Sequence, residues 1–155
     1  MIALIQRVQR ASVTIENNKI SEIGNGFLVL LGVGEDDSEK QAEILAKKTA
    51  NLRIFTDEND KMNLSPIQLV ADKKDCKILV VSQFTLYAMC KGQNRPSFIS
   101  AAAPDTANEL YEKYMELLKG YGLEVEKGEF GADMKVELVN DGPVTIIMDT
   151  DIWKK

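Results

Sequence analysis

Two short, continuous apolar segments constrain the fold of this chain most. Phe27–Val33 lies between glycines, and Lys77–Phe84 is centred on the branched aliphatic residues Ile78–Val81. An uninterrupted apolar run of about 4 to 8 residues is typical of a strand that is buried on both faces. We therefore expect both segments to be interior strands of a sheet.

The other segments with strand character are less uniformly apolar. Ile2–Ile15 is rich in β-branched residues, and it predicts a strand, or a strand with a bend, that ends at the turn Glu16–Lys19. Shorter strands are expected at Arg53–Phe55, at Met134–Leu138, where apolar and charged residues alternate, and at Val144–Met148.

Each of two predicted helices has its own start signal. Ser38 and Gln41 form a capping box, in which the two side chains satisfy amides at the start of a helix. Pro104 suits a first helical turn because proline has no amide hydrogen to lose there, and Gly120 and Gly122 are stop signals. Strands thus outnumber helices, and two helices remain to cover one face, which predicts a mixed α/β or α+β fold. The 155 residues suit one domain over residues 1–155.

The chain contains no histidine. This excludes Ser-His-Asp and Cys-His catalysis, zinc bound by histidine, and imidazole as a general base. Any chemistry must come from carboxylates, hydroxyls, lysine, cysteine, backbone groups or the substrate. We expect neither a metal nor a cofactor.

The sequence also bears on cellular location. Cys76 and Cys90 are too few for a disulfide scaffold, so reduced cytosolic thiols are expected. No apolar run approaches the roughly 20 residues that cross a bilayer, and Met1–Arg7 lacks the layout of a signal peptide. We therefore expect a cytoplasmic protein with no membrane partner.

One segment stands apart in charge from a chain whose net charge is −5. That net charge argues against a broadly basic nucleic-acid binder. However, Thr85–Ser100 contains no acidic residue and carries both Lys91 and Arg95. The segment is either a solvated loop or a small site for phosphate.

Candidate catalytic groups gather where a predicted strand ends. Ser82 and Thr85 offer hydroxyls, Gln83 offers an amide, and the backbone N–H groups of Phe84 and Thr85 are candidate oxyanion donors. A strand end suits a site because the strand is rigid while its terminal amides are free. The alternative is a strand end whose hydroxyls merely cap the local backbone.

The second candidate segment is Asn140–Thr145, which contains Gly142 and Pro143. Its composition is that of a turn between two strands. Sequence does not decide the isomer of the Gly142–Pro143 bond, because about 5–6% of such bonds in folded proteins are cis.

These segments together resemble the D-aminoacyl-tRNA deacylase family. The similarity extends from Met1 to about Asp149, with the segments in the same order and with compatible spacing. The segments that carry it are Met1–Val8, Lys61–Leu64, Ser82–Ala88, Arg95–Phe98, Phe130–Met134 and Asn140–Thr145. One departure is Met89-Cys90, where bacterial members of the family often have Asp-Thr.

The resemblance implies a homodimeric, cytosolic tRNA-editing hydrolase. Such an enzyme cleaves the ester between a D-amino acid and the 3′-terminal adenosine of tRNA, without a cofactor. The implied fold is α/β, with a mixed, barrel-like sheet on which two main helices pack. Glycine has no side chain to be rejected, so glycyl-tRNA is expected as a second substrate.

The resemblance also assigns roles to residues of this chain. Ser82–Thr85 line the pocket, and Gly142-Pro143 form a Gly-cis-Pro element that each subunit inserts into the site of its partner. Arg7 braces that element, and Met134 packs near the terminal adenosine. Val144 and Thr145 join the substrate-binding set, whereas Lys91 and Arg95 are expected to contact RNA.

Two questions stay open at this level. The first is mechanism: the favoured one combines backbone oxyanion donors with the 2′-hydroxyl of the substrate, and the alternatives use Thr85 or Cys90 as a nucleophile. The second is function, since a non-catalytic dimeric RNA-binding module using Lys91, Arg95 and Lys154-Lys155, or a generic esterase, is also compatible with the residues.

Overall fold

The computed structural model describes residues 1–153, so Lys154 and Lys155 of the RNA-binding alternative lie outside the described residues. The strands are β1 (Ile2–Ile15), β2 (Asn18–Ile23), β3 (Gly26–Gly32), β4 (Phe55–Thr56), β5 (Met62–Leu64), β6 (Lys77–Ser82), β7 (Glu124–Lys127) and β8 (Lys135–Asp149). The helices are α1 (Glu39–Ala50), α2 (Pro66–Ala71) and α3 (Pro104–Gly120), with the 3-10 helices η1 (Phe84–Tyr87) and η2 (Thr150–Trp153). In the part of the chain so described, no helix is long and apolar enough to cross a membrane.

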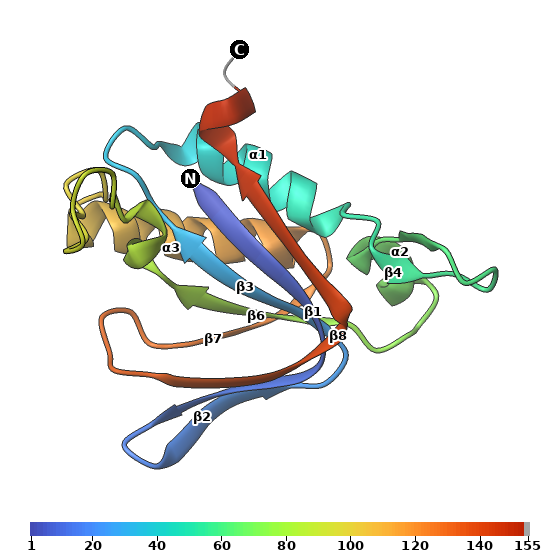
Figure 1. Cartoon of the computed structure of the whole chain (residues 1–155). Coiled ribbons are helices and arrows are strands. Elements are labelled where there is room, and N and C mark those ends of the chain that lie inside the picture. Colours follow the sequence, from blue (N-terminus) through green and yellow to red (C-terminus); the bar gives the residue numbers. More distant parts are fainter. Residues whose placement is uncertain (154–155) are drawn as a thin grey trace.

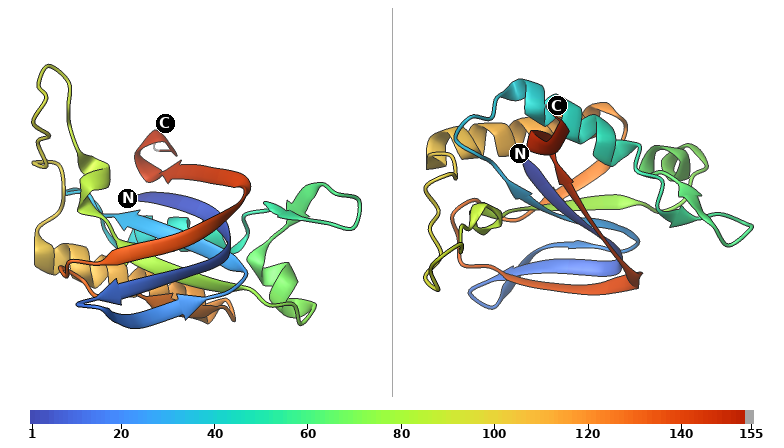
Figure 2. Two further views of the ribbon diagram at one scale, coloured as in Figure 1. Left: turned by 60° about the horizontal axis from the view of Figure 1, so that its bottom comes forward. Right: turned by 45° about the horizontal axis from the view of Figure 1, so that its top comes forward.

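Six strands form one mixed sheet in the order β2-β1-β3-β6-β7, with β8 also paired to β1. β3, β6 and β7 are parallel, whereas β1 pairs antiparallel with β2, β3 and β8. The first half of β1 pairs with β3 and its second half with β2, while β8 follows β1 along both halves. The sheet therefore curls over and nearly closes into a barrel (Figures 1 and 2), which confirms the expected fold class.

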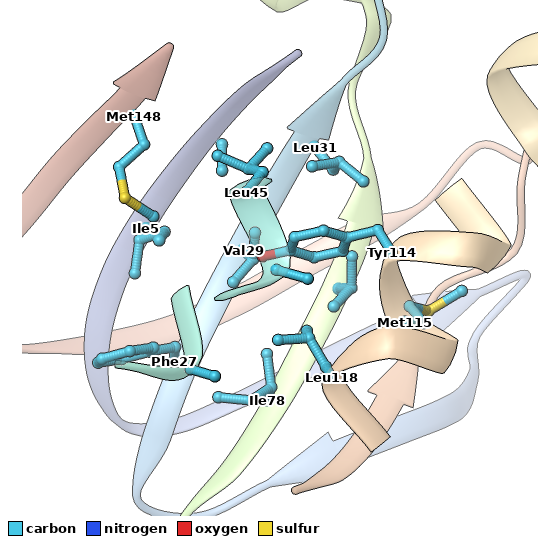
Figure 3. Close-up of a cluster of buried hydrophobic side chains, with 14 of the residues drawn as sticks. Ile5, Phe27, Val29, Leu31, Leu45, Ile78, Tyr114, Met115, Leu118 and Met148 are labelled. Atoms are coloured by element: carbon cyan, nitrogen blue, oxygen red, sulfur yellow. The ribbon is translucent and has the colours of Figure 1, made fainter. Parts of the chain in front are cut away.

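The main core lies between the sheet and two helices. α1 and α3 lie side by side across one face of β1, β3 and β6 (Figure 1). Leu45 of α1, and Tyr114 and Leu118 of α3, pack against Phe27 and Ile78 of the sheet (Figure 3). Full burial of one such side chain contributes about 1.5–3 kcal/mol, so this layer dominates the stability of the fold.

A second, smaller core fills the inside of the curled sheet. Val8 and Val13 of β1 meet Leu28, Leu79 and Val81 there. β3 and β6 thus send alternate side chains into the two cores, which confirms that both are buried on both faces. Their unbroken apolar sequence follows from that double burial.

The expected helix starts are confirmed. Gln41 Oε1 accepts hydrogen bonds from the backbone N of Ser38 at 2.9 Å and from its hydroxyl at 2.7 Å. α3 begins at Pro104 and ends at Gly120, as its start and stop signals predict. The short helix α2 and the strands β2, β5 and β7 were not expected, and the strand predicted at Arg53–Phe55 begins only at Phe55.

The separate strands expected at Met134–Leu138 and Val144–Met148 are wrong as two elements. Apart from Met134, both segments belong to the single 15-residue strand β8, so Asn140–Thr145 is not a turn between strands. The physical reason is the length of β1, which has 14 residues and pairs with β8 along both of its halves. The extra residues are accommodated as a bulge within the strand.

Candidate active site

An apolar cavity of about 660 Å³ lies where β6 ends. Its walls come from β3, β6, α3 and the segment before β8. The lining residues are Leu31, Val33, Val81, Ser82, Gln83, Phe84, Phe98, Ala101, Ala102, Pro104, Ala107, Tyr111, Phe130, Gly131, Ala132, Asp133, Met134 and Val136. Four predicted site residues, Ser82, Gln83, Phe84 and Met134, are thereby brought together.

The chain changes direction at this cavity because β6 passes directly into η1. The amide of Gln83 still donates to the Leu31 carbonyl at 2.8 Å, which keeps the strand end attached to β3. Gln83 Nε2 then donates to Thr85 Oγ1. Thr85 is exposed and does not line the cavity, and its hydroxyl oxygen is occupied by this bond from the Gln83 side chain.

Aromatic side chains lie at the entrance of the cavity and in its wall. Phe84 is 57% exposed, and its ring meets Phe98 edge-on with 5.0 Å between ring centroids. On the wall, the Tyr111 hydroxyl donates to the Val80 carbonyl at 2.9 Å, and its ring lies 6.0 Å from that of Phe130. Burial raises the pKa of Tyr111, so its hydroxyl stays protonated at neutral pH.

Met134 is held in the wall by its sulfur. The Glu129 amide donates to Met134 Sδ at 3.4 Å. A Cβ atom at Gly128 would lie 2.6 Å from the same sulfur, so a glycine is needed there for Met134 to adopt this position. The thioether is therefore fixed on the cavity side of the sheet.

The predicted RNA-binding residues lie on a loop beside the entrance. Met89 and Ser97 pair through two backbone hydrogen bonds of 2.8 and 3.0 Å, which closes the loop at its base. Lys91 and Arg95 are exposed between them, and neither forms an ion pair within residues 1–153. Cys90 is an exposed free thiol in the same loop.

The Gly142–Pro143 segment forms a bulge in β8. Gln6 lies opposite Thr145 and Val8 opposite Asn140, so Arg7 alone faces the four intervening residues. The Gly142–Pro143 peptide bond is cis, and both residues are exposed. The bulge is where β8 turns a sharp corner in Figure 1.

Two side chains hold the bulge from beneath. Arg7, 8% exposed, donates from Nε to the Asp141 carbonyl at 2.8 Å and from Nη1 to the Ile54 carbonyl at 2.6 Å. Asn140 accepts from the Val144 amide at 2.7 Å and donates back to the Val144 carbonyl at 3.2 Å. These contacts leave the bulge little freedom to move.

Thr145 and Val144 anchor the end of the bulge without reaching the cavity. Asn140 Nδ2 donates to Thr145 Oγ1 at 3.2 Å, and Gln6 Nε2 donates to the same oxygen at 3.3 Å. Val144 is buried in the main core. Neither residue lines the cavity of its own chain.

The bulge and the cavity lie at different places along the sheet. Ser82 is in register with Ala3 through Leu31, whereas Arg7 is in register with Ile78 through Phe27. The four residue steps from Ala3 to Arg7 correspond to about 13 Å along the strand. Gly142, Pro143 and Arg7 therefore do not line the cavity of their own chain.

Two residues that shape the cavity and the bulge were not singled out from the sequence. Tyr111 lies within the helix predicted to begin near Pro104, and its place in a cavity wall depends on how α3 packs. Asn140 was included only as part of a turn-like segment, although a short amide side chain at the edge of a bulge is typical of backbone bridging. Within residues 1–153 no group of three or more acidic or cysteine side chains is placed to hold a metal ion.

Comparison with known proteins points to one family. The family model described as D-Tyr-tRNA(Tyr) deacylase matches residues 4–149. A D-aminoacyl-tRNA deacylase of Thermosipho africanus is 51% identical over 150 residues, covering 97% of each chain. The one of Fusobacterium nucleatum is 55% identical over 150 residues, covering 97% of this chain and 96% of the relative.

Solved structures agree with this fold. The c-Myc DNA unwinding element binding protein superposes with a TM-score of 0.85 at 41% identity, over 96% of this chain and 98% of that one. A probable eukaryotic D-amino acid tRNA deacylase superposes with a TM-score of 0.78 over 95% of this chain and 97% of that one. At 17% identity, the second match is evidence of a shared fold alone.

Proposed function

This chain belongs to the D-Tyr-tRNA(Tyr) deacylase family, and we propose that it is a tRNA-editing hydrolase that cleaves the ester bond of D-aminoacyl-tRNA. The observation that carries the proposal is the cavity beside Ser82–Phe84. Its apolar and aromatic lining, including Phe98, Tyr111 and Phe130, suits the terminal adenosine and its aminoacyl group. Met134 lies in the same wall, where it would contact the adenine base.

The reaction relies on positioning rather than on a protein base. Among the described residues that line the cavity, only Tyr111 and Asp133 have acidic or basic side chains. Tyr111 stays protonated, and Asp133 is 88% exposed and pairs with Lys135 at 3.1 Å. Water attacks the ester carbonyl carbon, the bond to the 3′-oxygen breaks, and the 2′-hydroxyl relays the proton from water to that oxygen.

Backbone donors stabilise the oxyanion in this mechanism. Phe84 and Thr85 are the first two residues of η1, and the first amides of a helix have no acceptor within it. One such donor is worth about 3–4 kcal/mol in well-studied hydrolases. Because Gln83 holds the Thr85 hydroxyl, Thr85 serves through its backbone amide rather than as a nucleophile.

The active unit is a homodimer in which the bulge of one chain completes the cavity of the other. Three observations support this arrangement. Gly142 and Pro143 are exposed and held by hydrogen bonds, they do not line the cavity of their own chain, and within residues 1–153 β8 pairs with no strand other than β1. Ile147, 66% exposed on the same strand, adds apolar surface for the contact. We expect the interface to bury about 1,200 Å² or more.

Chirality is selected by the bulge acting as a wall. Arg7 and Asn140 prevent it from yielding, and Gly142 presents only backbone to the substrate. When the ammonium group and the ester carbon of the substrate are both held in place, the side chain of an L-amino acid would clash with this backbone. The side chain of a D-amino acid would point away from it. Glycine has no side chain to be rejected, so glycyl-tRNA is the second substrate.

Lys91 and Arg95 contact the RNA phosphates, and the enzyme works in the cytoplasm, where aminoacyl-tRNA is used.

The test is deacylation of D-Tyr-, L-Tyr- and Gly-tRNA by the purified protein. We expect hydrolysis of the D-Tyr and glycyl esters and survival of the L-Tyr ester. Binding of tRNA without hydrolysis would indicate the RNA-binding module instead. Equal hydrolysis of free aminoacyl esters would indicate a generic esterase, and a fully active monomer would refute the shared site.

The same assay distinguishes the mechanisms. Thr85→Ala should retain activity within about tenfold of the wild type, because the decisive donor is the backbone amide. A substrate that ends in 2′-deoxyadenosine should be hydrolysed far more slowly. An inactive Thr85→Ala enzyme combined with normal turnover of the 2′-deoxy substrate would establish Thr85 as the nucleophile.

A further inference from the structure

η1, the 3-10 helix that carries Phe84 and Thr85, rests on the end of β3, where two glycines leave room for it. A Cβ atom at Gly32 would lie 3.1 Å from Leu86 Cβ and 3.2 Å from the Gln83 carbonyl oxygen. A Cβ atom at Gly34 would lie 2.8 Å from the Tyr87 hydroxyl oxygen and 2.9 Å from its ring. The Tyr87 ring therefore lies directly against the backbone of Gly34.

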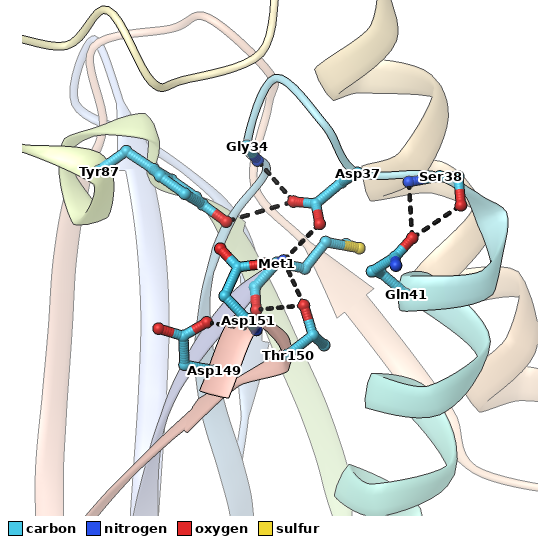
Figure 4. A network of polar contacts seen from close by, with 9 residues as sticks. All are labelled: Met1, Gly34, Asp37, Ser38, Gln41, Tyr87, Asp149, Thr150 and Asp151. Atoms are coloured by element: carbon cyan, nitrogen blue, oxygen red, sulfur yellow. Dashed lines mark hydrogen bonds and ion pairs between the residues drawn. The ribbon is translucent and has the colours of Figure 1, made fainter. Parts of the chain in front are cut away.

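A polar network holds the far end of that ring (Figure 4). The Tyr87 hydroxyl donates to Asp37 Oδ2 at 3.2 Å, and the Gly34 amide donates to the same oxygen at 2.6 Å. Asp37 Oδ1 accepts from the Met1 amino group at 2.6 Å, and that group also donates to Thr150 Oγ1 at 2.6 Å. The Asp37 side chain is only 3% exposed. Tyr87 is thus linked through Asp37, in the loop before α1, to the residue that precedes β1 and to the first residue of η2.

The geometry of a 3-10 helix makes this anchor matter for the site. Residues three apart project from the same side of such a helix, and Tyr87 is three residues after Phe84. η1 has a single turn of four residues, so it has little internal resistance to rotation about its axis. Rotation would displace the amides of Phe84 and Thr85 together. Burial, and then the charge of Asp37, raise the pKa of Tyr87, so its hydroxyl remains the donor in the bond.

We propose that Asp37 is a positioning residue for the active site, and that it acts through Tyr87 to fix the orientation of η1 and of the amides that face the ester. Asp37 does not line the cavity. The inference rests on the proposed function, because it assigns the oxyanion donors to η1.

Tyr87→Phe removes the hydroxyl and keeps the ring. We expect kcat for D-Tyr-tRNA to fall about tenfold with KM within about twofold, since the substituted side chain does not line the cavity. Tyr114→Phe is the matched control, because its buried hydroxyl donates to Thr49 Oγ1 at 2.8 Å between α1 and α3. It should lower the melting temperature and leave kcat unchanged. A Tyr87→Phe enzyme with wild-type kcat, or an equal loss of kcat in both variants, would overturn the proposal.

Asp37→Asn tests whether Asp37 and Tyr87 act as one unit. It removes the charge that pairs with the Met1 amino group, so the melting temperature should fall along with kcat. If Asp37 acts through Tyr87, the double variant should have a kcat no lower than that of the worse single variant. Losses that multiply would show that Asp37 acts by another route.

Amide hydrogen exchange separates this inference from the proposed function. The amides of residues 83–88 should exchange several times faster in Tyr87→Phe than in wild type or Tyr114→Phe. If the wild type hydrolyses no D-aminoacyl-tRNA, the proposed function is wrong. The exchange rates still report whether Tyr87 anchors η1. Unchanged exchange in Tyr87→Phe would overturn the anchoring itself.

Discussion

At one end of the sheet, β6 passes into η1 beside a cavity, whereas further along the sheet β8 forms a bulge that projects outward from the fold. The cavity is lined by apolar side chains from four parts of the fold. The bulge is held by hydrogen bonds from Arg7 and Asn140, and its outer residues, Gly142 and Pro143, are exposed.

The difference shows that the two regions obtain their shape in different ways. A cavity formed by packing tolerates the loss of one contact, because its shape depends on many. A bulge held by a few polar contacts depends on each of them. If the bulge selects the substrate in a partner subunit, its rigidity must come from these side chains alone.

Arg7→Ala should have the largest effect. It leaves the carbonyls of Ile54 and Asp141 without their donor in a nearly buried position, which should cost about 3 kcal/mol of unfolding free energy. D-Tyr-tRNA hydrolysis should fall with it. Arg10→Ala, on the same strand but exposed, is the control and should stay within about 0.5 kcal/mol of wild type by chemical denaturation. Equal stability of the two variants would show that the bulge does not depend on Arg7.

Gly142→Ala should impair catalysis next. Its Cβ atom would lie 2.7 Å from Val144 Cγ2, and the φ of 144° disfavours any side chain, so the bulge must shift. A displacement of about 1 Å in a substrate-positioning element costs on the order of 10²-fold in rate. We expect that loss for both D-Tyr- and Gly-tRNA, measured as kcat/KM.

Gly122→Ala provides the matched control for that variant. Gly122 also has a positive φ, of 84°, but a Cβ atom there would meet nothing within 4 Å. Both variants should lose about 1–3 kcal/mol of stability from backbone strain. Only the Gly142 variant should lose activity, and parallel losses would place the effect in stability rather than in the bulge.

Asn140→Asp should have a smaller effect. The carboxylate keeps an acceptor for the Val144 amide but cannot donate to the Val144 carbonyl, so we expect a loss of about 1 kcal/mol. The loosened bulge should also let some L-Tyr-tRNA be hydrolysed. Asn25→Asp, which breaks a single bond to the Asp75 carbonyl, is the isosteric control. Unchanged D-over-L discrimination in Asn140→Asp would show that this clamp does not set chirality.

Cys90→Ser should have almost no effect. Cys90 is exposed on the loop beside the cavity and does not line it, so hydrolysis should remain within about twofold of wild type. Cys76 gives a contrast within the same chain, since burial raises the pKa of its thiol to about 12. A thiol reagent should therefore modify Cys90 rapidly and Cys76 only on unfolding. An inactive Cys90→Ser enzyme would restore Cys90 as a candidate nucleophile.

Much of this architecture was predictable from sequence because it depends on local patterns. The unbroken apolar runs identified β3 and β6, and the capping pair Ser38 and Gln41 identified the start of α1. The continuous strand β8 was not predictable, because the composition of Asn140–Thr145 is the same in a turn and in a bulge. Only its long antiparallel partner decides between them.

The sequence by itself indicated the buried strands β3 and β6, the starts of α1 and α3, the family that the chain resembles, and that no histidine takes part in its chemistry. The tertiary structure alone decided that Arg7 lies beneath a bulge 134 residues away in the chain, and that this bulge stands about 13 Å along the sheet from Ser82. The physical reason is that hydrophobic periodicity and capping act over a few neighbouring residues. Strand register and sheet closure are set by pairings between distant segments, and no local pattern encodes them.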